Sequence, residues 1–204
     1  EKYARIIKIF RAHVSMTKQL TIVWFRQDLR LTDNPALTAA VANGQIIPVF
    51  IADDTAPKSA LLGGASQWWL HNSLLSLNKS LNNQLVIKGG NPLSVLQALI
   101  TEYDATHVVW NRIYEPWQIK RDAAIKTELK QQGISVGSFN GSLLWEPMSV
   151  LKKDETPYKV FTPYYRKGCL TRQSPRLPLA KPENFSIHVN AQFTLDALNS
   201  LALL

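Results

Sequence analysis

Two cations and one anion follow the first apolar run of the chain. The run Thr21–Phe25 stops abruptly at Arg26-Gln27-Asp28-Leu29-Arg30, and a proline soon opens an Ala/Leu-rich stretch. This order is typical of a buried strand, a charged loop and a helix with proline in its first turn. Open α/β sheets bind ligands at the carboxyl ends of such strands. Arg26, Asp28 and Arg30 are therefore candidate ligand contacts, and a solvated loop with a local ion pair is the alternative.

A second segment rich in chemistry is Trp110–Asp122, WNRIYEPWQIKRD. Asn111 ends a strand-like run, and Glu115 precedes a predicted helix, where the helix dipole stabilises a carboxylate. Trp117, in the first helical turn, has a flat face that either packs in a core or stacks on a planar ligand. These three residues are further candidate contacts. The structural alternatives are a helix cap for Glu115 and a core position for Trp117.

The elements that position these segments are five strand-like runs that alternate with four helical patterns. The predicted strands are Thr21–Phe25, Ile46–Ile51, Gln84–Lys88, His107–Asn111 and Ser135–Phe139. The predicted helices are Pro35–Asn43, Ser66–Asn82, Asn91–Tyr103 and Pro116–Gln132, and Leu70, Leu74, Leu77 and Leu81 form a buried stripe in the second helix. The pattern predicts an α/β fold, a doubly wound, Rossmann-like, five-stranded parallel sheet of order 3-2-1-4-5.

This order makes the first and fourth strands neighbours, so the loops Arg26–Asp33 and Asn111–Pro116 are expected to meet in one crevice. Arg26 would supply charge or hydrogen bonds to a ligand there, and Trp117 would supply a stacking surface. Glu115 would accept a hydrogen bond from the ligand or hold one of the arginines. The charges that follow on the same helix, Arg121 and Asp122–Lys126, are predicted to lie on its surface.

The charge of the chain is concentrated at its ends. The 204 residues carry a net charge of +8, yet residues 21–150 hold ten Lys/Arg and ten Asp/Glu. Residues 1–20 and 151–204 each carry a net charge of +4. Because phosphate neutralisation dominates nucleic-acid affinity, the neutral middle predicts weak, non-specific DNA binding at most.

Several classes of protein are disfavoured by what the sequence lacks. There is no GxGxxG or GxxxxGK[ST] motif, and Gly63-Gly64 and Gly89-Gly90 indicate turns rather than phosphate cradles. The four histidines and Cys169 show no metal-ligand spacing. A single cysteine excludes an internal disulfide and favours a reducing compartment. No apolar run approaches the roughly 20 residues that span a bilayer. We expect a cytoplasmic, monomeric protein without a membrane partner.

Three segments are predicted along the chain. Residues 1–19 are expected to be an N-terminal extension in which Lys2–Ala12 forms a basic amphipathic helix, and Met16 is the expected true start. Residues 20–150 form the α/β domain. Residues 151–204 are expected to be an interdomain linker, with the aromatic-rich Tyr158–Arg166, the proline-containing Ser174–Pro182 and a final helix around Leu195–Leu201, cut from something longer.

Four motifs in this order resemble those of the DNA photolyase and cryptochrome family, in the class that repairs cyclobutane pyrimidine dimers. They are WFRQDLRLTDNPAL, SQWWLHNSLLSLNKSL, WNRIYEPWQIKRD and YKVFTPYYRK, and the resemblance covers about Leu20–Pro182. It implies that the α/β domain holds an antenna chromophore, a folate or a deazaflavin. A larger C-terminal helical domain, absent from this chain, would bind FAD and the flipped-out dimer.

The resemblance also implies the antenna contacts. Phe25, Arg26, Asp28 and Arg30 match the family's first loop, and Asn111, Glu115, Trp117 and Gln118 match the second. In folate-binding members an Asn-Glu pair falls where this chain has Trp117-Gln118, whereas the form Glu115-Pro116 occurs in relatives that use a deazaflavin or an unassigned antenna. The identity of the chromophore therefore stays open.

The function implied is the antenna domain of a cyclobutane pyrimidine dimer photolyase. Its partners would be its own FAD-binding domain and, through the full-length protein, damaged DNA. The chain alone is expected neither to bind FAD nor to repair DNA. Two alternatives remain: the same domain of a cryptochrome-type light receptor, and a nucleotide-binding α/β module without light chemistry.

Overall fold

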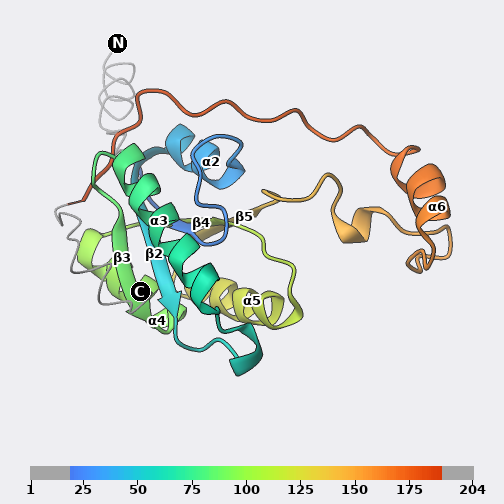
Figure 1. Cartoon of the computed structure of the whole chain (residues 1–204). Helices are drawn as coiled ribbons and strands as arrows, with labels where there is room; N and C mark the ends of the chain where they lie inside the picture. The colour runs from blue at the N-terminus through green and yellow to red at the C-terminus, as the bar shows by residue number, and fades with distance from the viewer. Residues whose placement is uncertain (1–18, 190–204) are drawn as a thin grey trace, which may run out of the picture.

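A single parallel sheet organises the computed structural model, which describes residues 19–189 (Figure 1). Its strands are β1 (Gln19–Phe25), β2 (Gly44–Asp53), β3 (Val86–Gly90), β4 (His107–Asn111) and β5 (Ser135–Phe139), in the order β3-β2-β1-β4-β5. Every neighbouring pair of these strands is parallel. The predicted doubly wound sheet and its strand order are confirmed. The helices predicted at the two ends of the chain, Lys2–Ala12 and Leu195–Leu201, lie outside the described residues.

Four helices connect these strands, and their ends agree with the sequence prediction to within two residues. They are α2 (Pro35–Asn43), α3 (Gly64–Ser80), α4 (Pro92–Tyr103) and α5 (Pro116–Gln131). Asn34 caps α2 by accepting a hydrogen bond from the Leu37 amide at 3.0 Å, and Asn91 caps α4 in the same way. The turn predicted at Gly89-Gly90 is wrong. These two residues are the last two of β3, where they pair with the end of β2.

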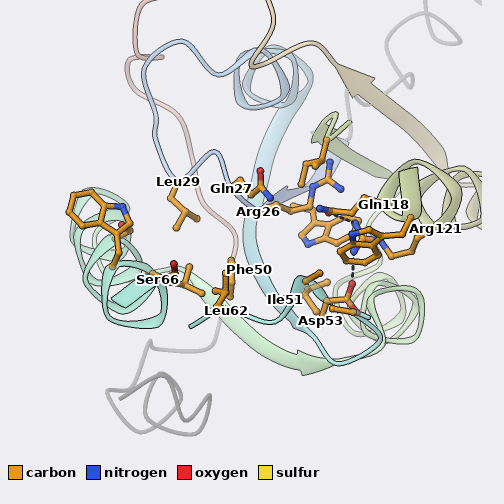
Figure 2. A pocket seen from close by; sticks show the side chains of 18 of the residues that line it. Arg26, Gln27, Leu29, Phe50, Ile51, Asp53, Leu62, Ser66, Gln118 and Arg121 are labelled. Atoms are coloured by element: carbon orange, nitrogen blue, oxygen red, sulfur yellow. Dashed lines mark hydrogen bonds and ion pairs between the residues drawn. The ribbon is translucent and has the colours of Figure 1, made fainter. Parts of the chain in front are cut away.

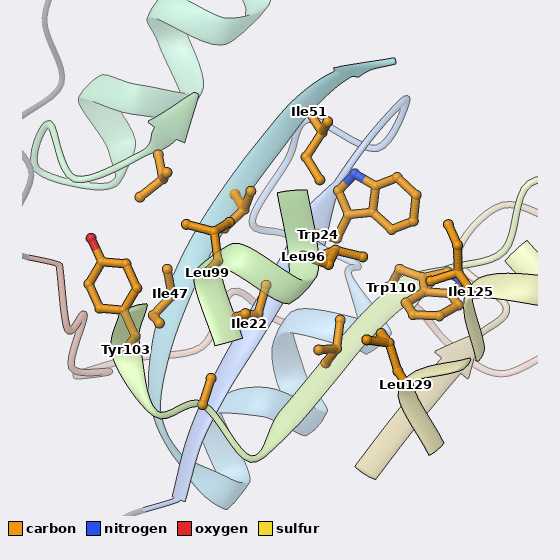
Figure 3. Packing of buried hydrophobic residues seen from close by; sticks show 14 residues of the cluster. Ile22, Trp24, Ile47, Ile51, Leu96, Leu99, Tyr103, Trp110, Ile125 and Leu129 are labelled. Carbon is orange, nitrogen blue, oxygen red and sulfur yellow. The ribbon is translucent and has the colours of Figure 1, made fainter. Parts of the chain in front are cut away.

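The core has two halves because successive side chains of a strand point to opposite faces of the sheet. Ile22 and Trp24 join the cluster under α4 and α5, whereas Val23 and Phe25 join the cluster under α2 and α3. Figure 3 shows the first cluster, in which the rings of Trp24 and Trp110 meet edge to face at 5.7 Å. Both tryptophans are about 1% exposed and are partners in the β1–β4 register. The floor beneath the carboxyl edge of the sheet is thus rigidly packed.

Beyond β5 the chain leaves the sheet and forms a projection that we call the arm, residues 143–173 (Figure 1). It contains three short helical segments, η2 (Pro147–Ser149), α6 (Phe161–Pro163) and the π-helical η3 (Tyr164–Cys169). The arm packs on itself: Leu151 and Pro157 form an antiparallel bridge, and Gly168 and Cys169 are buried.

The segment after the arm returns to the α/β domain (Figure 1). The Ile46 amide donates to the Ser186 carbonyl at 3.0 Å, and the His188 amide donates to the Ile46 carbonyl at 2.9 Å. Phe185 and Ile187 pack against the cluster under α2 and α3. These residues pair with the part of β2 that β3 does not reach, so the end of the predicted linker is anchored to the sheet.

Candidate functional site

Two hollows open at the carboxyl edge of the sheet. The larger, which we call the main cavity, has a volume of about 890 Å³ and lies between α3 and α5. The smaller, the side hollow, has a volume of about 520 Å³ and lies over the loops that follow β1 and β4. Gln27, Arg30 and Ile113 border both hollows. Both therefore lie where open α/β sheets bind ligands.

The main cavity has one largely apolar wall and one polar, aromatic wall. Figure 2 shows Leu29 and Ser66 facing Gln118 and Arg121 across it. Trp69, on α3, also lines the cavity and is 70% exposed, so a ligand there would find an uncovered aromatic face. A cavity of this size with a few polar groups on apolar walls suits an organic ligand of drug or cofactor size.

Two arginines and two aspartates form a network at the base of the polar wall. Arg26 donates from Nη1 to Asp122 Oδ2 at 2.6 Å and from Nη2 to the Asn111 carbonyl. Arg121 donates from Nη2 to Asp122 Oδ1 at 2.7 Å and from Nη1 to Asp53 Oδ2. All four charged side chains are less than 15% exposed. Each buried cation is matched by an anion, as the cost of burying charge requires.

Arg26 is the most deeply placed member of this network. Burial lowers the pKa of its guanidinium from the ordinary value, and the neighbouring Asp122 carboxylate opposes that shift. Its Nε atom is buried without a hydrogen-bond partner among the described residues, as is Nε1 of Trp24. These two unpaired N–H groups belong to residues that line the main cavity.

Aromatic rings and guanidinium groups alternate along the same wall. The Arg26 guanidinium lies 4.7 Å from the centre of the Trp24 ring, and the Arg121 guanidinium lies 5.3 Å from that ring. Arg121 is also 5.0 Å from the Trp117 ring. Cation–π attraction within about 6 Å, away from water, fixes such groups relative to one another.

Asn111 holds together the loops around the side hollow. Its amide nitrogen donates to Asp28 Oδ2 at 2.5 Å and to Asn34 Oδ1 at 2.8 Å, and its oxygen accepts from the Ala36 amide. Asp28 also accepts a bond from the Arg26 amide at 2.9 Å. The structure thus gives Asn111 and Asp28 internal partners and makes them supports of the first loop.

The structure distributes the eight predicted contact residues among three places. Arg26, Arg30, Trp117 and Gln118 line the main cavity; Asp28, Arg30, Asn111 and Glu115 line the side hollow; and Phe25 lies in the core and lines neither. The predicted adjacency of β1 and β4 is confirmed. The loops that follow them do border shared hollows. Ligand binding by these residues stays a prediction.

One prediction about α5 is wrong, and one of the two roles expected for Glu115 is not seen, while its contact with a ligand stays a prediction. Asp122 is buried and the Arg121 side chain is only 14% exposed, so both belong to the network and not to the helix surface. Glu115 is exposed, and its carboxylate accepts from the side chain of Gln118 and holds no arginine. It occupies the N-cap position without a side-chain capping bond. The carboxylate that holds Arg26 is that of Asp122, two helical turns further along α5.

The sequence carried signals for the residues that were missed. Asp122 falls on the same stripe as Ile125 and Leu129, which are buried, so its spacing placed it on the inner face of α5. Asp53 stands at the carboxyl end of β2, beside the end of β1 in the predicted order. Both aspartates were therefore candidates for the crevice on topology alone.

The comparisons with known proteins identify the family. The model of the DNA photolyase family matches residues 21–183. The chain belongs to the DNA photolyase family. It is 45% identical over 157 residues to a deoxyribodipyrimidine photo-lyase of Agrobacterium fabrum, covering 75% of this chain and 32% of that protein. It is 40% identical over 166 residues to cryptochrome-2 of Arabidopsis thaliana, covering 79% of this chain and 27% of that protein.

A solved member of the DNA photolyase family has the same fold. The crystal structure of a class III photolyase from Agrobacterium tumefaciens superposes with a TM-score of 0.84 at 40% identity, covering 94% of this chain and 40% of that one. The chain thus spans about a third of the length of the curated relatives it matches. Between residues 19 and 189 there is no helix long and apolar enough to cross a membrane, and no cluster of side chains suited to a metal ion.

Proposed function

We propose that this chain is the antenna-binding domain of a light-driven DNA repair enzyme that splits cyclobutane pyrimidine dimers. The main cavity would hold the light-harvesting chromophore, a folate or a deazaflavin, which when bound absorbs light and passes the energy to FAD. FAD and the damaged DNA would be bound by another part of the full-length protein, corresponding to the two thirds of the photolyase relative that this chain does not match. Such an enzyme would work in the cytoplasm as a monomer.

The observation that carries this proposal is the chemistry of the main cavity. It offers rings for stacking in Trp69 and Trp117, and amides for hydrogen bonding in Gln27 and Gln118. Arg30 borders the cavity as well and adds a cationic hydrogen-bond donor at its rim. The residues present therefore fit a flat, heteroatom-rich ring system.

A cryptochrome-type light receptor without repair activity is the second candidate, because cryptochrome-2 of Arabidopsis thaliana shares 40% identity with this chain. The two candidates require the same antenna domain. A protein that contains this chain and an FAD-binding domain would distinguish them: light-dependent cleavage of a thymine dimer supports repair, and its absence in a flavin-loaded protein supports signalling. The match to the DNA photolyase model is the reason we do not propose the nucleotide-binding module.

The antenna proposal is tested by the absorption spectrum and chromophore content of that two-domain protein. Trp117→Ala should lower antenna occupancy roughly tenfold, as expected for a lost stacking surface, and leave the dark FAD content unchanged. Arg26→Ala is a poorer probe because Arg26 is buried and paired with Asp122. Loss of FAD together with the antenna would mean that the substitution had unfolded the α/β domain. Full antenna occupancy in Trp117→Ala would place the chromophore elsewhere.

The chain of 204 residues alone should neither bind FAD nor repair DNA, because its match covers only 32% of the photolyase relative. Stoichiometric flavin that copurifies with this chain would contradict the assignment of FAD to the other domain. The affinity for DNA should be weak and salt-sensitive, since phosphate contacts with the basic ends would supply most of it.

A further inference from the structure

Arg121 is a buried cation whose three nitrogen atoms are all held in place. Nε donates to Asp122 Oδ1 at 3.1 Å, and Nη2 donates to the same oxygen and to Gln118 Oε1. Nη1 donates to Asp53 Oδ2, and the side chain is 14% exposed. Because a guanidinium is planar, bonds on three sides fix the orientation of its face as well as its position.

The Arg121 guanidinium contacts two tryptophan rings. One is Trp24, which the core immobilises at 1% exposure. The other is Trp117, which stands one helical turn before Arg121 on α5, is only partly buried and lines the main cavity. Since Trp24 cannot move, the position of Arg121 sets where the Trp117 ring rests.

Asp53 is the carboxylate that keeps Arg121 in this position. Asp122 is shared between Arg121 and Arg26, whereas Asp53 pairs with Arg121 alone among the described residues. The two oxygens of Asp53 have separate roles: Oδ2 accepts from Arg121, and Oδ1 accepts from the Thr55 amide at 2.8 Å and the Thr55 hydroxyl at 2.5 Å. Without the Asp53 charge, two arginines would compete for one buried carboxylate.

We propose that Asp53 and Arg121 are positioning residues for the chromophore in the main cavity. Asp53 holds Arg121, and Arg121 holds the Trp117 ring as a stacking wall. The inference rests on the proposed antenna function and adds which residues hold its stacking wall in place. Because two aspartates already neutralise the two arginines, this wall meets the ligand through the flat face of the Trp117 ring and not through an unpaired charge.

The test uses the 204-residue chain with Asp53→Asn, which keeps an oxygen for Thr55 and removes the acceptor of Arg121. Methenyltetrahydrofolate and deazariboflavin are titrated separately, and binding is followed by the shift of their near-ultraviolet absorption. The dissociation constant of whichever probe binds should rise roughly tenfold, the scale of one desolvated cation–π contact. Thr55→Val, which removes only a bond to the other oxygen of Asp53, is the matched control and should bind as the parent does.

A second readout separates positioning from general destabilisation. Asp53→Asn should weaken the near-ultraviolet circular dichroism of tryptophan without ligand, and this change should vanish in a Trp117→Phe background. Arg121→Lys, which keeps the charge but loses the planar fork, should reproduce both effects and serves if Asp53→Asn does not fold. Unchanged affinity and an unchanged tryptophan spectrum in both variants would overturn the positioning role and leave the antenna proposal standing. A parent chain that binds neither probe would overturn the antenna proposal itself.

Discussion

The carboxyl edge of the sheet and the arm differ in what each exposes to solvent. At the carboxyl edge, charged side chains from β2, α5 and the loop after β1 are buried and matched with one another. The arm instead leaves large apolar side chains uncovered: Leu144, Met148, Val160, Phe161 and Leu170 are each more than half exposed. Side chains exposed to this degree contribute little to the packing of the arm.

The difference shows which part of the molecule is complete as a folding unit. The α/β domain encloses two clusters of buried residues and matches the charges of the network at the base of its main cavity internally. The arm has only a small interior around Val150 and Cys169. Substitutions should therefore affect the two regions of the isolated chain very differently.

The largest expected contrast is between a tryptophan of the core and an aromatic residue of the arm. Trp24→Ala removes a ring that is 1% exposed and leaves a cavity, so the free energy of unfolding should fall by about 3–5 kcal/mol. Phe161→Ala removes a ring that is 73% exposed, and the change should stay within about 0.5 kcal/mol. Urea unfolding followed by circular dichroism measures both. Comparable losses would show that the arm is part of the stable core.

A contrast of intermediate size concerns the arginines. Arg26→Met leaves the Asp122 carboxylate buried with Arg121 alone and the Asn111 carbonyl without its donor. We expect a loss of about 2–3 kcal/mol, below the full cost of breaking a buried pair because one partner remains. Arg172→Met in the arm removes only an exposed bond to the Leu151 carbonyl and should cost less than about 0.5 kcal/mol. Equal costs would mean that the buried network contributes little to stability.

The sequence predicted the positions of these elements better than the pairing of their charges. Strand and helix periodicity located the elements, and the prolines at positions 35 and 116 marked the starts of α2 and α5. The rule for doubly wound sheets supplied the strand order. The partner of each charged side chain was harder to predict, because it depends on which turn of α5 faces the crevice. Glu115 is nearer in sequence to the loop after β4, yet Asp122, on the inner stripe of α5, reaches Arg26. The spacing of residues predicts on which face of a helix a side chain lies. It does not predict which turn of that helix comes next to a given side chain on another element.

Replacing a glycine by alanine should have a smaller effect on stability, and one that differs between the α/β domain and the arm. A Cβ atom on Gly141 would lie 2.6 Å from Cγ of Asn111, the side chain that ties together the loops of the side hollow. Gly141→Ala should therefore lower the free energy of unfolding by about 1–2 kcal/mol. A Cβ atom on Gly168 would lie 2.7 Å from Val150 Cγ1, inside the arm. Gly168→Ala should raise amide exchange in the arm and leave global unfolding unchanged, which hydrogen exchange and urea titration would show together.

The smallest effect tests the contact through which the chain returning from the arm meets the loop after β1. Asp33 accepts hydrogen bonds from Arg176 and from the Leu179 amide, and its own amide donates to the Leu179 carbonyl at 2.9 Å. The Arg176 guanidinium, helped by the Leu179 amide, lowers the pKa of the Asp33 carboxyl from its ordinary value. A depressed pKa in the folded state means that the contact stabilises the fold at pH values above the unfolded pKa, near 3.9 for aspartate. This stabilisation is lost as pH falls through the folded pKa.

Arg176→Gln should raise the pKa of Asp33 toward that of a free aspartate, measured by an NMR titration of its carboxyl carbon. Because the pair is partly exposed, stability at neutral pH should change by less than about 1 kcal/mol. Asp33→Asn is the matched variant, since asparagine also tolerates the left-handed backbone found here, at φ 49°. An Asp33 pKa that is already ordinary in the parent chain would show that the returning segment is held by the sheet edge at Ile46 and Ile187 and not by this charge.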